Sequence, residues 1–207
     1  QLFAELYPGV VGTILSGWER SAALLVDHQK QAENTLLEQL PAVARRTLGD
    51  AYAIRDVRVF DSRTGALGDL ATVYVWRGRI ASIFPAGTKV PAEVPVVEGR
   101  GRTLLPALID MHGHESRWNA VLQIAGGVTT VRDMGIDRAE MSEMTAAFDS
   151  GRWLGPRLWK ACFIDGKSPF SSQGDGVAAS LDEALAIVDD CARTGYGQVK
   201  LYSSFAK

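Results

Sequence analysis

Residues 104–114 read LLPALIDMHGH, an apolar run that ends in two histidines separated by a glycine. In an extended strand, residues two apart lie on the same face, so His112 and His114 project together, about 7 Å apart along the chain. Two imidazoles in this relation can hold one metal ion, and Gly113 lets the backbone come close. The apolar residues predict that the histidines emerge at the carboxyl end of a buried strand. The spacing alone also fits two histidines that bond backbone carbonyls or water.

Strands and helices alternate after the start of this run. The patterns predict strands at residues 104–114, 128–133, 157–163 and 198–202, and helices at residues 118–125, 138–148 and 181–192. Such alternation favours a parallel sheet with helices packed outside it. Four strands in about 100 residues amount to the first half of a (β/α)8 TIM barrel, which typically has about 250 residues. Active sites of that barrel lie at the carboxyl ends of its strands, where the two histidines are expected.

Two further regions precede the α/β domain, which is expected over residues 104–207. Residues 51–103 are expected to form a small antiparallel β-sandwich unit, with strands at residues 57–60, 72–76 and 80–84. Residues 1–50 are expected to be helical, because apolar residues recur there at helical spacing: Trp18, Ala22, Leu25, Ala32, Leu36 and Leu40. Pro41 is expected to interrupt this helix and Gly49 to stop it, while His28 is expected on its solvated face.

The composition narrows the range of partners. A formal net charge of −2 gives no reason to expect nucleic acid or an anionic membrane as partner, and no apolar run approaches the roughly 20 residues that span a bilayer. Cys162 and Cys191 are too few for a disulfide scaffold and are interpreted as two small buried hydrophobic residues. No signal peptide is evident, which leaves both the cytoplasm and export after signal removal open. A homo-oligomer is compatible with the sequence.

These features together resemble the amidohydrolase superfamily, whose barrel begins with a strand that ends in a His-x-His pair. The run GVTTVRDMG at residues 127–135, the tripeptide at 155–157 and the loop at 164–170 resemble the subgroup that contains imidazolonepropionases and Xaa-Pro-type dipeptidases. The family generally has glycine after the proline at the start of the first strand, whereas this sequence has Ala107 after Pro106. The resemblance covers residues 51–207 and extends to no part of the preceding helical segment.

The resemblance implies a site with one or two divalent metal ions, Zn²⁺ in the first place. His112 and His114 would be the first pair of ligands, and Lys200, at the end of the fourth barrel strand, would carry a carbamate that bridges two metals. The alternative for Lys200 is a lysine that reaches solvent or pairs with a carboxylate. Two further histidines and the general-base aspartate of the family lie on later strands, beyond Lys207.

The activity implied by the resemblance is hydrolysis of a C–N bond in an amide, a peptide or a cyclic amide, by a metal-activated water. The substrate would be a small molecule or a dipeptide. Arg132, Lys167 and Ser168 are candidates for binding it. Arg132 and Asp133 end the second strand, where they could reach the site or simply pair with each other, and the two loop residues could simply be solvated. Asp110 could orient a ligand or make a structural hydrogen bond.

Two alternatives of another class stay open. The chain could be a non-catalytic fragment that needs a partner segment, or a metal-binding scaffold without catalysis. Only part of the family's site can be matched to these 207 residues, so the isolated chain is expected to have little or no turnover.

Overall fold

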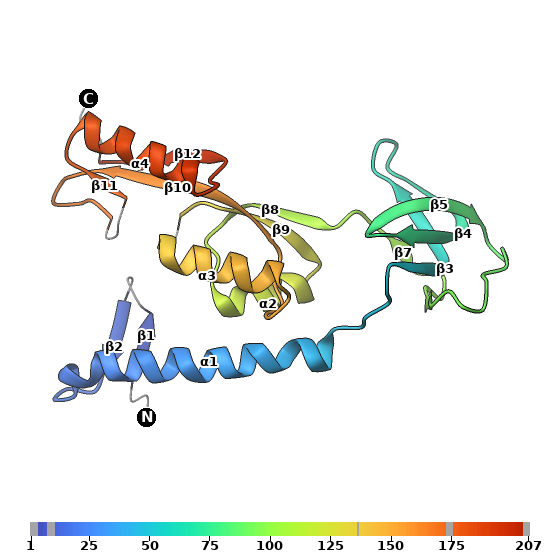
Figure 1. Cartoon of the computed structure of the whole chain (residues 1–207), viewed down its shortest axis with the longest axis horizontal. Coiled ribbons are helices and arrows are strands. Elements are labelled where there is room, and N and C mark those ends of the chain that lie inside the picture. Colours follow the sequence, from blue (N-terminus) through green and yellow to red (C-terminus); the bar gives the residue numbers. More distant parts are fainter. Residues whose placement is uncertain (1–3, 8–10, 136, 173–175, 205–207) are drawn as a thin grey trace. The chain divides into compact units, whose positions relative to one another are not determined.

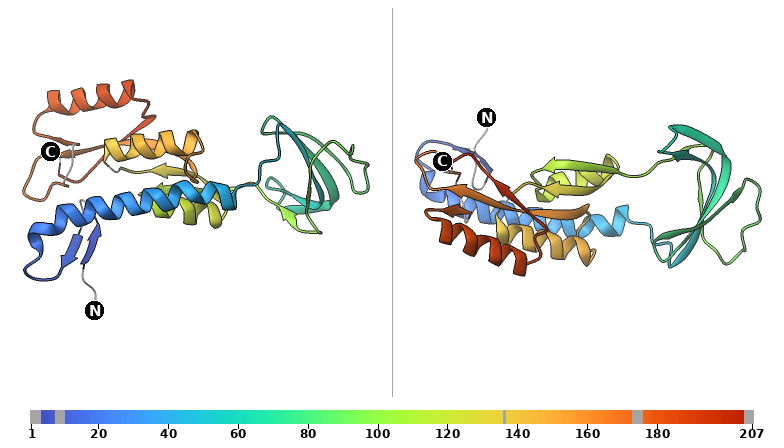
Figure 2. Two further views of the ribbon diagram at one scale, coloured as in Figure 1. Left: turned by 60° about the horizontal axis from the view of Figure 1, so that its bottom comes forward. Right: turned by 90° about the horizontal axis from the view of Figure 1, so that it is seen from above.

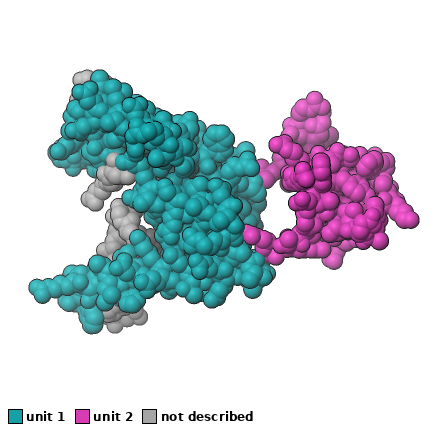
Figure 3. Space-filling model, viewed as in Figure 1, with its two compact units in different colours: residues 1–44, 108–207 teal, residues 45–107 magenta. Residues whose placement is uncertain are grey.

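The computed structural model describes residues 4–7, 11–135, 137–172 and 176–204. The chain divides into two compact units, Gln1–Ala44 with Leu108–Lys207 and Arg45–Ala107, which are coloured separately in Figure 3. No helix within the described ranges is both long enough and apolar enough to cross a membrane.

The first unit contains a parallel sheet, as the alternating pattern predicts (Figure 1). Its strands are β8 (Leu108–Gly113), β9 (Val128–Asp133), β10 (Arg157–Gly166), β11 (Val177–Ala178) and β12 (Gln198–Leu201). β8 pairs with β9 and β9 with β10, while β10 also pairs with β11 and β12, and all these pairings are parallel. The protein is therefore a mixed α/β protein with an N-terminal helix.

The strand that carries the histidines differs from the expectation in length and burial. It begins at Leu108 rather than Leu104, because the segment with Pro106, which has no backbone N–H to donate, does not pair. The expected burial is wrong: Leu108 and Ile109 are each 58% exposed and Met111 56% exposed. Among the described strands β8 pairs with β9 alone, so this edge strand has no neighbour on its other side.

Three helices follow the strands and start at side-chain caps. They are α2 (Arg117–Ala125), α3 (Arg138–Asp149) and α4 (Leu181–Arg193). Ser116, Asp137 and Ser180 each accept a hydrogen bond from a backbone N–H in the first turn, which satisfies a donor that the helix itself leaves unpaired. The bounds of all three helices agree with the predicted ones to within one residue.

The N-terminal helix α1 (Ala22–Ala44) packs against α2 and α3 (Figure 2). Its contact residues are Leu37, which is 1% exposed, and Leu40, which lie in one cluster with Met144, Ala147 and Trp153. Leu36, expected on the apolar face, is instead 51% exposed, since the buried stripe runs through the adjacent position. His28 is exposed, as expected.

The helical prediction for residues 1–50 is wrong in three places, one of which is the end of the helix: α1 stops at Ala44 and not at Gly49. An antiparallel hairpin of β1 (Ala4–Tyr7) and β2 (Val11–Ile14) precedes a short 3-10 turn, η1 (Glu19–Ser21), and α1 begins only after it. Pro41 does not interrupt α1, which continues to Ala44. Proline removes only one hydrogen bond from a helix, and here the missing bond falls in the last two turns of a helix that packs through Leu37 and Leu40.

Arg117, at the start of α2, joins three helices. Its guanidinium bonds Asn34 on α1 and pairs with Glu143 on α3 at 2.7 Å, while its side chain is only 8% exposed. The same group lies 5.1 Å from the ring centroid of Trp153. A buried cation is stable only when it is paired, so these contacts fix the position of α1 on the α2–α3 pair.

Cys162 and Cys191 form a disulfide, which overturns the interpretation as two separate hydrophobic side chains. Both residues are buried, as expected, in a cluster with Ile164 and Ala178. The bond joins β10 to α4. It forms because the packing of α4 on β10 brings the two Cα atoms to 5.9 Å, within the range that a disulfide spans.

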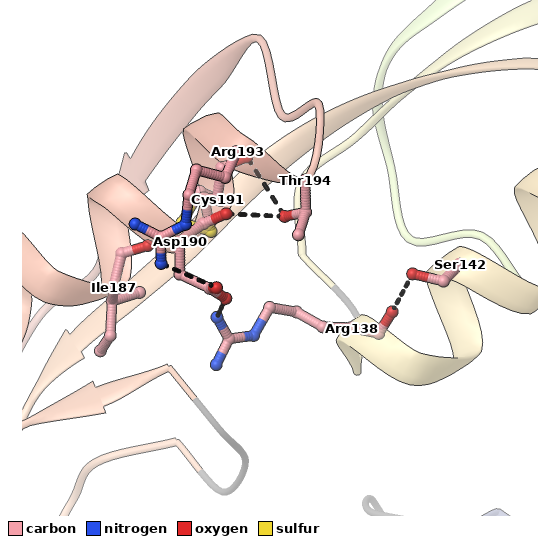
Figure 4. Close-up of polar contacts among 8 residues, drawn as sticks. Arg138, Ser142, Ile187, Asp190, Cys191, Arg193 and Thr194 are labelled. Carbon is pink, nitrogen blue, oxygen red and sulfur yellow. Dashed lines mark hydrogen bonds and ion pairs between the residues drawn. A yellow bond between two sulfur atoms is a disulfide. The ribbon is translucent and has the colours of Figure 1, made fainter.

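The carboxyl end of α4 is also tied to α3. Asp190 on α4 pairs with Arg138 on α3 at 2.9 Å and with Arg193 at 3.3 Å, and Figure 4 shows the three side chains meeting beside Cys191. Thr194 closes the helix by donating its hydroxyl to the backbone carbonyl of Asp190. α4 and the strand that follows it are thus held to the rest of this unit at several points.

The second unit is a five-stranded sheet. Its strands are β3 (Ala51–Asp61), β4 (Ala66–Trp76), β5 (Arg79–Pro85), β6 (Val96–Glu98) and β7 (Thr103–Leu104). β3, β4 and β5 are antiparallel as predicted, but β6 and β7 run parallel to β3 and make the sheet mixed. β6 lies beside residues 53–55 of β3 and β7 beside residues 58–59, so the chain follows β3 in the same direction through both short strands. Its hydrophobic core cluster contains the buried residues Val57, Val73 and Val75.

Candidate functional site

His112 and His114 lie next to each other at the end of β8. Their ring centroids are 5.6 Å apart, and both residues are exposed. The backbone N–H of His112 donates to Oδ1 of Asp110 at 2.9 Å, and Gln123 of α2 donates to Oδ2 of the same carboxylate. The two side chains therefore project from the same face of the strand, as the two-residue period predicts, and their rings are adjacent. Asp110 binds the backbone of this segment.

The ring of His114 makes one hydrogen bond, between Nδ1 and the backbone carbonyl of Gly135 at 3.0 Å. Gly135 follows the end of β9, so this bond connects the ends of two neighbouring parallel strands. The other ring nitrogen, Nε2, makes no hydrogen bond to the described residues. His114 is thus anchored on one side and open on the other.

Asp133, the last residue of β9, is fully buried beside these histidines. Its Oδ2 accepts a hydrogen bond from the backbone N–H of Glu115 at 2.6 Å, and Oδ1 accepts one from the backbone N–H of Gly135 at 2.8 Å. Burial raises the pKa of Asp133, although these two bonds and the nearby side chains of His114 and Lys200 act in the opposite direction. The sequence leaves two possibilities for Asp133 and Arg132, that they reach the site or that they pair with each other. The pairing is not formed: Arg132 donates to the carbonyl of Met111 at 2.7 Å.

Glu115 is a second buried carboxylate, directly after His114. It is 4% exposed, and its Oε1 accepts a hydrogen bond from the backbone N–H of Ser116, while Oε2 is buried without a partner among the described residues. Burial, with the nearby charges of Asp133 and Asp110, raises the pKa of Glu115 to about 7. Nothing in the sequence pattern distinguished this residue from a solvated glutamate at a strand end.

Replacing Glu115 by glutamine is expected to flatten the dependence of stability on pH. The raised pKa means that the folded protein holds the proton more tightly than the unfolded chain. The favourable contribution is therefore complete below the unfolded pKa of 4.5 and is lost as the pH rises through about 7. Above pH 7, Glu115→Gln should exceed the wild type in free energy of unfolding by on the order of 2 kcal/mol, and below pH 4.5 the two should agree. Urea denaturation of the metal-free proteins from pH 4 to pH 8 measures this, and parallel curves would contradict it.

Lys200 lies on β12, in register with Phe163 of β10. Its Nζ is 5.5 Å from the ring centroid of Phe163 and 5.2 Å from that of Tyr202. Lys200 is half-buried, while its neighbours Val199 and Leu201 are 45% and 68% exposed. Within the described ranges it pairs with no carboxylate, so the ammonium group rests on two aromatic rings.

The loop after β10 contains the other two candidates. Lys167 is exposed, and its backbone N–H donates to the carbonyl of Ala178. Ser168 is half-buried and is used within the loop: its Oγ accepts from the backbone N–H of Phe170, and its own N–H donates to Oγ of Ser171. A role of either side chain in binding a substrate stays a prediction.

Asp165 was not singled out from the sequence, yet it organises this end of the sheet. It is fully buried, and its carboxylate accepts hydrogen bonds from the backbone N–H groups of Gly166, Ser172 and Ser204 at 3.0, 2.9 and 2.8 Å. Burial alone would raise the pKa of Asp165, but these hydrogen bonds together outweigh it and hold the pKa below its usual value. The available signal was the recurrence of an aspartate at or near the end of β8, β9 and β10.

The described residues alone do not make a full set of conventional metal ligands. Across the described ranges, no three histidine, cysteine, aspartate or glutamate side chains are grouped so that they could hold a metal ion. Two adjacent imidazoles are half of the four ligands of a typical zinc site. A metal ion at these two histidines would therefore need further ligands.

Solved structures with a similar fold are prolidases, dipeptidases and amidohydrolases, whereas no protein-family model and no curated protein matches the sequence. A protein assigned as a prolidase from Bifidobacterium longum has a TM-score of 0.66 at 23% identity, over 77% of this chain and 42% of its own. The bottromycin amidohydrolase has a TM-score of 0.66 at 20% identity, over 86% of this chain and 40% of its own. A Xaa-Pro dipeptidase with bound methionine has a TM-score of 0.61 at 20% identity, over 73% and 46%.

These likenesses define the class of fold. The chain shares the fold of part of these prolidase, dipeptidase and amidohydrolase structures, in agreement with the resemblance found in the sequence motifs. It spans less than half the length of the structures that it matches. At identities of 18–23%, the similarity to these amidohydrolases and prolidases establishes a shared fold.

Proposed function

We propose that this chain is the N-terminal, metal-binding part of a hydrolase that cleaves C–N bonds. The observation that carries the proposal is the adjacent pair His112 and His114 at the carboxyl end of a parallel strand, in a fold shared with prolidases and amidohydrolases. The substrate class is an amide, a peptide or a cyclic amide in a small molecule or a dipeptide. The Xaa-Pro dipeptidase among the similar structures favours peptides with proline as the first to be tried.

The proposal includes a TIM barrel of which this sheet is the first half. β8 and β12 each pair with a single described strand, and each exposes large apolar side chains: Leu108, Ile109 and Met111 on β8, Val199 and Leu201 on β12. Unpaired strand edges and exposed apolar side chains are both unfavourable in water. Closure by further strand–helix units would pair both edges and cover these residues.

The metal site would be built from His112, His114 and Lys200. Bound Zn²⁺, as one ion or two, lowers the pKa of a bound water to near 7 and polarises a carbonyl group. The exposed imidazoles suit such an ion, since each can offer a nitrogen lone pair. Lys200 would contribute as a carbamate, which turns a cation into an oxygen ligand. The absence of a paired carboxylate among its described neighbours leaves its Nζ free for that modification.

The chain's own residues would position the reaction. Asp110 and Asp133 hold the backbone on either side of the histidines, and Asp165 holds the loop that contains Lys167 and Ser168. These two residues and Arg132 would contact the polar groups of the substrate. The carboxylate that moves the proton from water to the leaving amine would be supplied by a later strand.

Zinc binding to the 207-residue chain tests this proposal. Isothermal titration should show binding that falls about 100-fold when either His112 or His114 is replaced by asparagine, because each change removes one of the few ligands. His28→Asn is the matched control, since His28 is the remaining histidine and is exposed on α1. Equal affinity in all three variants and the wild type would show that the metal lies elsewhere.

The alternative function is a metal-binding fragment without catalysis of its own. The exposed apolar edges favour the need for a partner segment. We expect the isolated chain, loaded with zinc, to hydrolyse no member of a panel of Xaa-Pro dipeptides and N-acyl amino acids. Turnover that disappears in His114→Asn would refute this expectation and would show that the 207 residues contain a complete active site.

A further inference from the structure

The carboxylate of Asp133 binds two backbone segments that both adjoin His114. One contains Glu115, the next residue in the chain, and the other contains Gly135, whose carbonyl contacts the ring of His114. One carboxylate oxygen accepts from the N–H of Glu115, the residue after His114, at 2.6 Å. The other accepts from the N–H of Gly135 at 2.8 Å, and the carbonyl of Gly135 meets Nδ1 of His114 at 3.0 Å. A single buried carboxylate thus holds both the backbone that follows His114 and the residue that binds its ring.

We infer that Asp133 is a positioning residue that sets the orientation and the tautomer of His114, so that Nε2 faces outward as the metal-binding nitrogen. This inference rests on the proposed function, in which His114 is a metal ligand. Asp133 makes its contacts with backbone groups and would not touch the metal itself.

The chemistry of the Gly135 carbonyl determines the tautomer. A carbonyl oxygen can only accept a hydrogen bond, so the nitrogen that meets it must carry the proton. A neutral imidazole has one N–H and one lone pair, and with the proton on Nδ1 the lone pair is on Nε2. A ligand histidine needs a free lone pair, and a fixed partner at its other nitrogen is a common means of orienting it.

The position of Gly135 itself leaves no room for adjustment. Its φ is +117°, a conformation that side chains rarely allow, and a Cβ at this position would lie 2.8 Å from Cβ of Phe163. Gly135 therefore packs closely against Phe163, while its N–H is bound by Asp133. Phe163 on β10 is also paired in register with Lys200 on β12. The contact between Gly135 and Phe163 therefore links the segment after β9 with β10 and, through β10, with β12.

Asparagine is the informative replacement for Asp133. An ionised carboxylate has acceptors on both oxygens, and both are used here for N–H donors. Asparagine keeps one acceptor and turns an NH₂ group toward the second N–H, so one of the two anchors must separate. The shape of the side chain and its burial are otherwise preserved.

The test is ¹⁵N NMR of the histidine rings in the metal-free 207-residue chain at pH 8. The chain has three histidines, so each ring is assigned by its own asparagine variant. We expect His114 of the wild type to be protonated at Nδ1, and Asp133→Asn to give a mixture of tautomers. The matched control is Asp110→Asn, which should leave the ring of His114 unchanged because the amide of Gln123 can turn to satisfy the new side chain.

The outcomes are separable from those of the proposed function. A wild-type His114 that is not protonated at Nδ1 overturns the inference without the need for any variant. An unchanged tautomer in a folded Asp133→Asn also overturns it. Zinc affinity should fall about 10-fold in Asp133→Asn. If the wild type binds no zinc but the tautomer still depends on Asp133, the positioning role stands and the proposed metal function fails.

Discussion

Replacing Cys162 and Cys191 together by alanine is expected to lower the free energy of unfolding by about 3–4 kcal/mol. The two residues are 29 positions apart, and a disulfide across a loop of this length restricts the unfolded chain by that amount. The bond joins β10 to α4 within the cluster that contains Ile164, so its loss also loosens the packing of this helix. Urea denaturation of the oxidised wild type and of the double variant measures the difference.

Reduction of the wild type provides the control for this disulfide. Equilibrium unfolding in the presence of a thiol reductant should lower the stability of the wild type by a similar amount and leave the double variant unchanged. If reductant has no effect on the wild type, the two cysteines are not bonded. The interpretation from the sequence, as two separate buried side chains, would then be the right one.

Local patterns were sufficient to predict the order of the main strands and helices from β8 to β12. β9 occupies the predicted residues 128–133, and the three helices of the α/β part start and end within one residue of expectation. Periods of 2 and 3.6 residues, with a capping residue before each helix, are properties of neighbouring residues and need no knowledge of the fold. The parallel pairing followed because each strand is separated from the next by a helix.

Long-range contacts were beyond the reach of the same patterns. The disulfide depends on how α4 packs against β10, which the spacing of 29 residues does not reveal. The phase of α1 depends on its contact with Trp153, so Leu37 rather than Leu36 is buried. The exposure of Ile109 and Met111 depends on which strands lie beside β8. In each case the sequence indicated the apolar character of the residue, but it did not show which residues lie beside it in the fold.

The sequence predicted the two histidines of the candidate site and named Asp110 and Asp133 as possible members, but it did not reveal which backbone groups these carboxylates bind. His112 and His114 are adjacent because they are two residues apart on one strand, whereas Asp133 acts on backbone groups two and eighteen residues away. Almost every residue has a backbone N–H, so the type of the partner residue does not reveal such a hydrogen bond. The metal-binding roles of the histidines and of Lys200, and the substrate roles of Arg132, Lys167 and Ser168, remain predictions.

Asp165→Ala is expected to lower the free energy of unfolding by about 3–5 kcal/mol at pH 7, because it leaves three backbone N–H groups without their acceptor. The groups belong to Gly166, Ser172 and Ser204, so the change releases both the loop after β10 and the segment after β12. Hydrogen exchange should show the lost protection at these three amides and little change at the end of β8. Urea denaturation gives the size of the loss.

The dependence on pH distinguishes this role of Asp165 from simple packing. The pKa of Asp165 is below its usual value in the folded protein, so its contribution to stability is complete above the unfolded pKa of 3.8 and is lost as the pH falls through the lower folded value. The stability difference between wild type and Asp165→Ala should therefore be constant from pH 5 to pH 8 and shrink in more acidic solution.

Asp61→Ala is the matched control. Asp61 also ends a strand and accepts from one backbone N–H, that of Arg63, but it is partly exposed, so its loss should change stability by less than about 1 kcal/mol. A difference for Asp165→Ala that stays the same below pH 3 would mean that the cavity, and not the charged acceptor, accounts for the loss.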